Sequence, residues 1–130
     1  MKFKYKVRYA ETDQMGIVHH ANYLLYLEQA RIEWLDRKGI NYSNLEKEGI
    51  MLPVYNIDIS YKKPLTFGEN FTVKVNTLGI SGVKISFAYE ILNSKNEIST
   101  TATVVLVFMS AETRRPMKCP NDLYKIINAQ

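Results

Sequence analysis

Apolar and polar residues alternate along several stretches of the chain, which is the pattern of half-buried β-strands. The first stretch places Phe3, Tyr5 and Val7 on one face, between charged neighbours. Short turns rich in glycine and asparagine separate the later stretches and favour an antiparallel meander, with Gly79 and Gly82 framing one of the turns. The pattern therefore predicts the strands Lys2–Arg8, Val54–Tyr61, Asn70–Leu78, Val83–Leu92 and Ile98–Met109.

A different spacing, with apolar residues three or four positions apart, predicts a helix from about His20 to Arg37. Its main apolar positions are Tyr23, Leu27, Ala30 and Trp34. This face is too broad for a surface helix, so we expect the helix to lie in the core, with Gly39 as its C-terminal cap. Ser43–Glu48 is expected to form one helical turn, and a helix of about two turns is expected after Pro120.

One long helix and roughly five antiparallel strands predict an α+β fold in which a curved sheet wraps the helix. The chain shows no internal repeat, low-complexity stretch or long linker, so residues 1–130 are expected to form a single domain. Some strand faces remain apolar after the helix is placed, and they need a cover. We therefore expect a dimer that extends the sheet.

The composition agrees with this picture. Apolar residues make up 46% and charged residues 23% of the chain, which is ordinary for a soluble globular protein. The longest apolar run, Val104–Met109, is far too short to span a membrane. The single cysteine, Cys119, allows no intrachain disulfide, which suits a reducing cytoplasm and favours a passive thiol over a nucleophile.

The net charge of +4 is spread along the chain, with no dense basic block of the kind that nucleic acid requires. Separated cations suit a single anionic small molecule, such as a nucleotide-bearing acyl carrier, equally well. Most of these charges are expected simply to be solvated at the surface.

One polar segment carries candidate chemistry. Asp13 lies in a loop between the first strand and the long helix, followed by Gly16 and by the helix start at His19–Asn22. A loop Asp before a Gly often means only a turn. Here, however, Gly16 would let backbone amides approach a ligand, and the first helical turn offers free N–H groups to an oxyanion. The carboxylate could then attack a carbonyl carbon, or activate water to attack it.

Other chemistries fit the sequence less well. Metal binding is not expected, because His19 and His20 are adjacent and no third histidine exists. No serine lies in a nucleophile-elbow pattern, and no phosphate-binding glycine pattern occurs. For His20, a structural role as a helix cap or buried hydrogen-bonding group competes evenly with catalytic support. Glu28 and Arg31 are expected to form a buried ion pair, with a substrate-side role for Glu28 as the alternative.

Two strings of residues resemble the 4-hydroxybenzoyl-CoA thioesterase family, and within it the Tol–Pal-associated acyl-CoA thioesterase branch. The first is Tyr9-x-x-Thr12-Asp13-x-x-Gly16-x-Val18-x-His20-x-x-Tyr23-x-x-x-x-Glu28-x-Ala30-Arg31. The second is Tyr61-x-x-Pro64-x-x-x-Gly68-Glu69. Length and strand spacing also match, so the resemblance covers nearly the whole chain.

The resemblance implies a hotdog fold, in which a five-stranded antiparallel sheet wraps a long central helix. It also implies dimers with a continuous sheet, often paired into tetramers, and active sites at the dimer interface. The implied reaction is hydrolysis of an acyl-CoA to a carboxylic acid and free CoA, without a metal or organic cofactor. The sequence does not specify the acyl group, and an acyl-carrier-protein substrate stays open.

The family's essential aspartate falls on Asp13, as nucleophile or as general base, and the amide that polarises the thioester carbonyl falls at about His20. The His20 side chain matches the histidine of the Tol–Pal branch, whereas His19 replaces the usual aromatic residue. The implied binding residues for the substrate are Gly16, Val18, His19 and Tyr23. Relatives often carry a basic residue after Gly79, where this chain has Ile80 and Ser81, so Lys62, Lys63, Lys84 and Arg114 are the remaining candidates for contacts with the CoA phosphates.

Two other functions remain as alternatives. A hotdog hydratase or dehydratase uses a catalytic histidine with an acid on the central helix, whereas here the acid precedes the helix. A non-catalytic acyl-binding module would keep the pocket without the chemistry, which the joint presence of Asp13, Gly16 and His20 disfavours.

Overall fold

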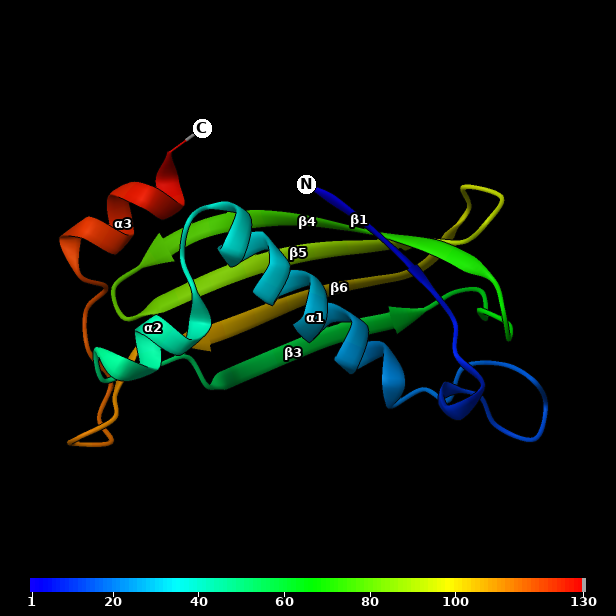
Figure 1. Ribbon diagram of the computed structural model, residues 1–130, viewed down its shortest axis with the longest axis horizontal. Coiled ribbons are helices and arrows are strands. Elements are labelled where there is room, and N and C mark those ends of the chain that lie inside the picture. The colour runs from blue at the N-terminus through cyan, green and yellow to red at the C-terminus, as the bar shows by residue number, and fades with distance from the viewer. Residues whose placement is uncertain (130) are drawn as a thin grey trace.

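The computed structural model describes residues 1–129 as one antiparallel sheet with helix α1 lying across its face (Figure 1). The strand order of the sheet is β1-β4-β5-β6-β3, and β4, β5 and β6 follow one another as the expected meander. The strands of this sheet are β1 (Lys2–Lys6), β3 (Val54–Tyr61), β4 (Asn70–Ser81), β5 (Lys84–Leu92) and β6 (Ile98–Val107).

The helices also lie close to their predicted positions. Helix α1 (Asn22–Arg37) begins two residues later than expected and ends before Gly39, whose φ of +83° is the left-handed conformation of a C-terminal cap. A short 3-10 helix, η1 (Tyr9–Glu11), precedes it. Helix α2 (Tyr42–Lys47) and helix α3 (Asn121–Asn128) correspond to the two short helices that the sequence predicts.

The turn between β4 and β5 differs from the prediction. Gly79 does not frame this turn but lies inside β4, where the pairing with β5 shifts register between Thr77 and Gly79. The φ of Gly79 is +102°, and its N–H donates to the Thr77 hydroxyl at 3.0 Å, which stabilises a β-bulge. The strand then continues to Ser81, and only Gly82 belongs to the turn.

The last predicted strand is also interrupted. Strand β6 ends at Val107, and Phe108 is fully buried with its N–H donating to the carbonyl of Val83 at 2.8 Å. The chain then forms the two-residue strand β7 (Met109–Ser110), which pairs with β2 (Ile50–Met51) outside the main sheet. The continuous apolar run did not indicate this break, because Phe108 would be buried whether the strand continued or ended there.

Helix α1 covers the sheet unevenly. The inward side chains of β4, β5 and β6, such as Val75, Phe87 and Val104, are at most 1% exposed. Strand β3 lies at one edge, and its inward residue Ile57 is 37% exposed. The apolar face of β3 is therefore only partly covered in a single chain: Ile59 packs against the core, whereas Ile57 does not. No helix within residues 1–129 is long and apolar enough to cross a membrane.

Candidate active site

A buried carboxylate, Glu11, joins the end of β1 to the start of α1. Its Oε1 accepts hydrogen bonds from the N–H of Arg8 at 2.8 Å and the hydroxyl of Tyr26 at 2.9 Å. Its Oε2 lies 3.1 Å from the Arg8 guanidinium. The backbone carbonyl of Glu11 accepts from the His19 N–H and the Asn22 side chain, at 2.9 and 2.8 Å. Both ends of the loop over residues 12–18 are thereby fixed.

Asp13 lies in this loop, in a tight turn that Gly16 closes. The N–H of Gly16 donates to the carbonyl of Asp13 at 3.0 Å, and the φ of +77° at Gly16 favours glycine. Asp13 Oδ1 accepts the N–H of Met15 at 2.8 Å. Within residues 1–129, Asp13 Oδ2 accepts no hydrogen bond, so this half-buried carboxylate keeps one oxygen for a ligand. Gly16 shapes the turn, and its N–H is bonded to Asp13 and therefore does not bind a ligand.

The start of α1 leaves a single free amide, where the sequence suggested several. The N–H of Ala21, the residue before α1, donates to His19 Nδ1 at 3.2 Å. The N–H of Asn22 donates to the His19 carbonyl, and the N–H of His19 itself donates to Glu11. Among the residues that the structure describes, only His20 between Val18 and Tyr23 has a backbone N–H without an acceptor.

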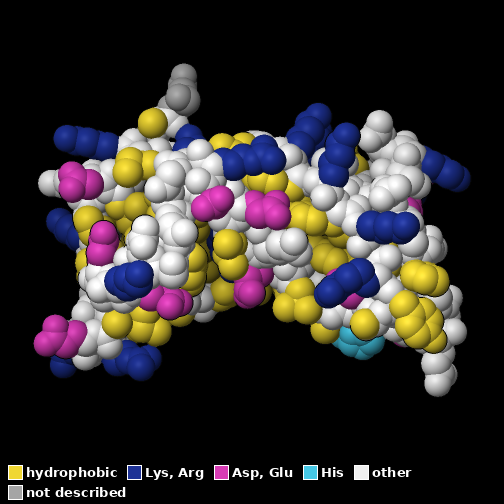
Figure 2. Space-filling view, viewed as in Figure 1, with side chains coloured by type: hydrophobic (Ala, Val, Ile, Leu, Met, Phe, Trp, Pro, Cys, Tyr) yellow, Lys and Arg dark blue, Asp and Glu magenta, His cyan; other side chains and the backbone are white. Residues whose placement is uncertain are grey.

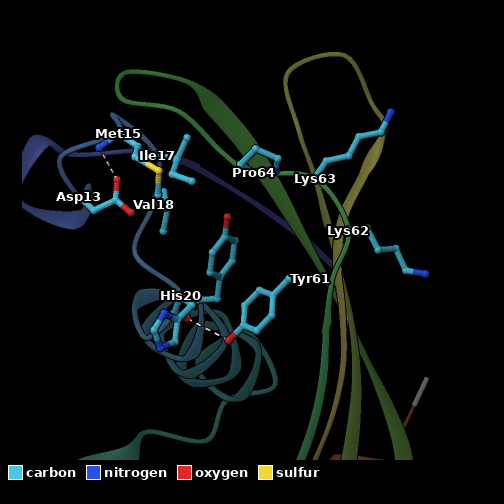
Figure 3. Close-up of a pocket in the computed structure, with 10 residues that line it drawn as sticks. Asp13, Met15, Ile17, Val18, His20, Tyr61, Lys62, Lys63 and Pro64 are labelled. Atoms are coloured by element: carbon cyan, nitrogen blue, oxygen red, sulfur yellow. Dashed lines mark hydrogen bonds between the residues drawn. The ribbon is translucent and has the colours of Figure 1, made fainter.

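Tyr61, the last residue of β3, reaches this helix start. Its hydroxyl donates to the carbonyl of His20 at 3.0 Å, as Figure 3 shows. Its ring lies edge-on to that of Tyr23, with centroids 5.2 Å apart. Tyr23 is buried, its hydroxyl accepts the N–H of Leu65 at 3.2 Å, and burial raises its pKa. These contacts fix the N-terminus of α1 to the edge of the sheet.

A pocket of about 370 Å³ opens between the Asp13 loop, the start of α1 and the end of β3 (Figure 3). It brings together residues that lie up to 51 positions apart in the chain and that supply both apolar walls and polar groups. The lining residues are Asp13, Met15, Ile17, Val18, His20, Tyr23, Tyr61, Lys62, Lys63 and Pro64.

The pocket thus contains six of the ten predicted site residues: Asp13, His20, Val18, Tyr23, Lys62 and Lys63. Figure 3 shows the Lys62 and Lys63 side chains extending away from Asp13, and Lys63 forms an ion pair with Glu97. The imidazole rings of His19 and His20 stack at 4.3 Å on an exposed surface near the N-terminal end of α1, at the lower right of Figure 2.

The other four predicted residues, Gly16, His19, Lys84 and Arg114, do not line this pocket. Lys84 begins β5 and lies 4.3 Å from the ring of Tyr55, near the opposite end of β3. Arg114 lies in the turn after β7, with its N–H bonded to the Ser110 carbonyl. A single chain therefore does not bring these two cations to the pocket.

The expected buried ion pair between Glu28 and Arg31 does not form. Arg31 is 8% exposed and donates to the hydroxyl of Tyr89 at 3.2 Å, whereas the Glu28 side chain is exposed. Helical spacing brought the two residues near each other, but the guanidinium turns toward the sheet and the carboxylate toward solvent. Burial raises the pKa of the Cys119 thiol to about 11, which keeps it protonated and unreactive at neutral pH.

Sequence reasoning missed the roles of Glu11 and Tyr61. Arg8 and Glu11 are three positions apart, a spacing that could have indicated their pairing. For Tyr61, the only signal is its place at the end of a predicted strand. Its contact with His20 joins residues 41 positions apart, which no local pattern encodes.

Comparison with known proteins gives concordant matches. The family described as the thioesterase-like superfamily matches residues 7–127. The putative acyl-CoA thioesterase YneP of Bacillus subtilis (strain 168) is 43% identical over 117 residues, covering 90% of this chain and 85% of that protein. The acyl-CoA thioester hydrolase YbgC of Escherichia coli O157:H7 is 25% identical over 123 residues, covering 93% and 92%. The solved DHNA-CoA thioesterase from Staphylococcus aureus has a TM-score of 0.86 and 34% identity, covering 90% and 78%.

Proposed function

This chain belongs to the thioesterase-like superfamily, with its hotdog fold, and is a thioester hydrolase; on that premise we propose that it hydrolyses an acyl-CoA to a carboxylic acid and free CoA. Within this proposal, α1 is the central helix that the sheet wraps, and its buried face supports that arrangement. The finer assignment to the Tol–Pal-associated branch rests on His20. The proposed location is the cytoplasm, which the single cysteine supports.

The observation that carries the proposal is that Asp13, which has an unbonded carboxylate oxygen, and His20, which has an unbonded amide, line the same pocket. Within residues 1–129, Asp13 Oδ2 accepts no hydrogen bond and the His20 N–H donates none. A thioester needs both groups, since its carbonyl carbon must be attacked while its oxygen gains negative charge. A preorganised donor at such an oxygen is worth about 3–4 kcal/mol in the transition state.

Two routes for Asp13 lead to the same products. As a nucleophile, its carboxylate forms a bond to the thioester carbon and expels the CoA thiolate, and water then hydrolyses the resulting anhydride. As a general base, it takes a proton from water while the water oxygen attacks that carbon and the thiolate leaves. In both routes the His20 amide stabilises the oxyanion, and the His20 side chain orients the thioester or the water.

A dimer formed through β3 is part of the proposal. The two free edges of the sheet differ: β1 carries the exposed residues Lys2, Lys4 and Lys6, whereas β3 carries exposed apolar side chains. Lysines on an edge strand oppose pairing with another chain. Figure 2 shows basic side chains over the right-hand part of the molecule, where β1 runs in Figure 1. Strand β3 carries one charged residue, Asp58, and no lysine, so its edge opposes pairing less than that of β1 does.

Antiparallel pairing of two β3 strands would place the start of one strand beside the end of the other. Lys84 contacts Tyr55 near the start of β3, and the pocket lies at Tyr61 at its end. The partner's Lys84 would thus approach the pocket of the first chain, although Lys84 is distant from the pocket within a single chain. Arg114 lies at the same end of the molecule as Lys84. These cations, with Lys62 and Lys63, are proposed to bind the CoA phosphates.

Pairing of dimers into tetramers is proposed through Leu25 and Ile32, which are exposed on the outer side of α1.

Release of free thiol from a panel of acyl-CoAs tests the function, with aliphatic, branched and aromatic acyl groups and an acyl-carrier-protein thioester included. We expect thiol release by the wild type and a loss of at least about 10³-fold in kcat for Asp13→Asn, because the amide neither attacks nor accepts a proton. The matched control is Asp36→Asn, an exposed aspartate on α1, which should leave the rate unchanged. Undiminished thiol release by Asp13→Asn would disprove the mechanism, and no release from any thioester would disprove the function.

A further inference from the structure

We propose that Tyr61 is a positioning residue for the oxyanion-binding amide of His20, because its hydroxyl holds the carbonyl of the same residue. The inference rests on the proposed function, because it assigns to Tyr61 a part in the same reaction. It does not require that Tyr61 touch the substrate. Its basis is the set of hydrogen bonds that surround His20.

The peptides on either side of His20 are held mostly from within the helix start. The carbonyl of His19 accepts the N–H of Asn22 at 2.9 Å. The carbonyl of His20 accepts the N–H of Tyr23 only at 3.4 Å, and the N–H of Ala21 donates to the His19 side chain. All these groups belong to residues 19–23, so they would move together with the helix start.

Four hydrogen bonds tie residues 19–23 to other parts of the described chain. On the β1 side, the His19 N–H and the Asn22 side chain both donate to the carbonyl of Glu11. On the β3 side, the Leu65 N–H donates to the Tyr23 hydroxyl, and the Tyr61 hydroxyl donates to the carbonyl of His20. Only the Tyr61 bond is made to His20 itself, whose free N–H is the proposed oxyanion donor. Loss of this bond would leave His20 held only through its neighbours in the chain.

Tyr61 is itself firmly held, which an anchor requires. It pairs with the buried Thr100 of β6, and the N–H groups of the next two residues, Lys62 and Lys63, both donate to the carbonyl of Ser99, at 2.8 and 3.0 Å. Its ring packs edge-on against the buried Tyr23. The strand therefore fixes the position of the Tyr61 hydroxyl, and the hydroxyl transmits that position to His20.

The Tyr61 hydroxyl contributes little to folding, which separates positioning from stability. Tyr61 is 48% exposed, so a carbonyl released by Tyr61→Phe can bond to water instead. The hydroxyl proton is donated to the His20 carbonyl, so this hydroxyl cannot also donate a hydrogen bond to a substrate. Its removal should therefore affect the chemical step, where the oxyanion forms, more than substrate binding or unfolding.

The test compares wild type, Tyr61→Phe and Tyr124→Phe. Tyr124 lies on α3 and is 47% exposed, and within residues 1–129 its hydroxyl makes no hydrogen bond, so it is a matched control. For Tyr61→Phe we expect kcat to fall about tenfold with KM within about twofold, because an oxyanion donor that is misplaced rather than lost forfeits part of its effect. The midpoint of thermal unfolding should stay within about 2 °C of wild type. Tyr124→Phe should match wild type in all three quantities.

Amide ¹⁵N relaxation supplies a readout that does not depend on turnover. The order parameters of the His20 and Ala21 amides should fall in Tyr61→Phe and stay unchanged in Tyr124→Phe. An unchanged kcat, a rise in KM without a fall in kcat, or unchanged order parameters would each overturn the proposal. If the wild type released no thiol, the proposed function would fail, while the relaxation measurement would still decide whether Tyr61 holds the His20 peptide.

Discussion

At the scale of single residues, Glu69 shows how one carboxylate can steady a loop beside the pocket. Its two oxygens accept the N–H and hydroxyl of Thr66, at 3.0 and 3.2 Å, and those of Ser94, at 3.0 and 2.8 Å. Thr66 in turn pairs with Ile17, which lines the pocket. The acidic residue after Gly68, which the sequence offered only as a family landmark, therefore joins two turns and supports the Asp13 loop.

These contacts predict a pH dependence of stability. Burial alone would raise the pKa of Glu69, but the hydrogen bonds from Ser94 and Thr66 outweigh it and lower the pKa below the ordinary value of a glutamate. A carboxyl group with a lowered pKa in the folded state stabilises the fold above its unfolded pKa, and this contribution disappears as the pH falls through the folded value.

We therefore expect Glu69→Gln to unfold at a lower temperature than wild type at pH 7, and the difference to shrink as the pH falls from about 5 to about 3. Thermal unfolding followed by circular dichroism at several pH values measures this. Glu112→Gln is the control, because Glu112 is exposed and forms no hydrogen bond through its side chain within the described residues. A difference between wild type and Glu69→Gln that is constant with pH would contradict the assignment.

At the scale of elements, the joint between β1 and α1 determines where the Asp13 loop lies. Glu11 connects the two elements through Arg8 on one side and Tyr26 on the other. Burial and, to a smaller extent, the hydrogen bond to Glu11 raise the pKa of Tyr26. Because the Glu11 side chain is buried, its charge depends on these few donors for solvation.

Tyr26→Phe removes one donor from this buried carboxylate while the ring keeps its contact with Phe71, whose centroid lies 4.6 Å away. We expect the free energy of unfolding to fall by about 1.5–3 kcal/mol, the usual range for a hydrogen bond to a charged group. Urea denaturation measures the change. Tyr42→Phe is the comparison, since the half-buried Tyr42 hydroxyl has no hydrogen bond in the described part of the chain, and an equal loss in both variants would contradict a special role for the Glu11 bond.

At the scale of the whole molecule, the unequal edges of the sheet predict how two copies associate. Ile57 lies on the same face of the sheet as the buried Val104 but is 37% exposed, because β3 is an edge strand. A charged side chain at position 57 would have to be buried in a β3–β3 dimer. Burying one carboxylate without a partner costs too much free energy for the dimer to form.

Ile57→Glu should therefore convert a dimer to a monomer in size-exclusion chromatography with light scattering, and reduce thiol release if the partner completes the site. Lys4→Glu, on the opposite edge strand β1, should leave the molar mass unchanged. A wild type that is monomeric, or an Ile57→Glu variant that stays dimeric, would refute the proposed interface.

The sequence by itself determined the elements and the chemical content of the Asp13 loop. Strand alternation, helical spacing and the caps at Gly39 and Pro120 act over a few residues, so the sequence places β3, α1 and α3 almost where the structure has them. The prediction at Gly79 was wrong because a bulge and a turn both favour glycine.

Only the tertiary structure decided that His20 keeps the free amide and that Tyr61 reaches the His20 carbonyl. It also decided that Arg31 turns to Tyr89 and that Ile57 on β3 stays partly exposed. Each of these depends on hydrogen bonds or coverage between residues far apart in the chain, and a local period carries no information about such distances.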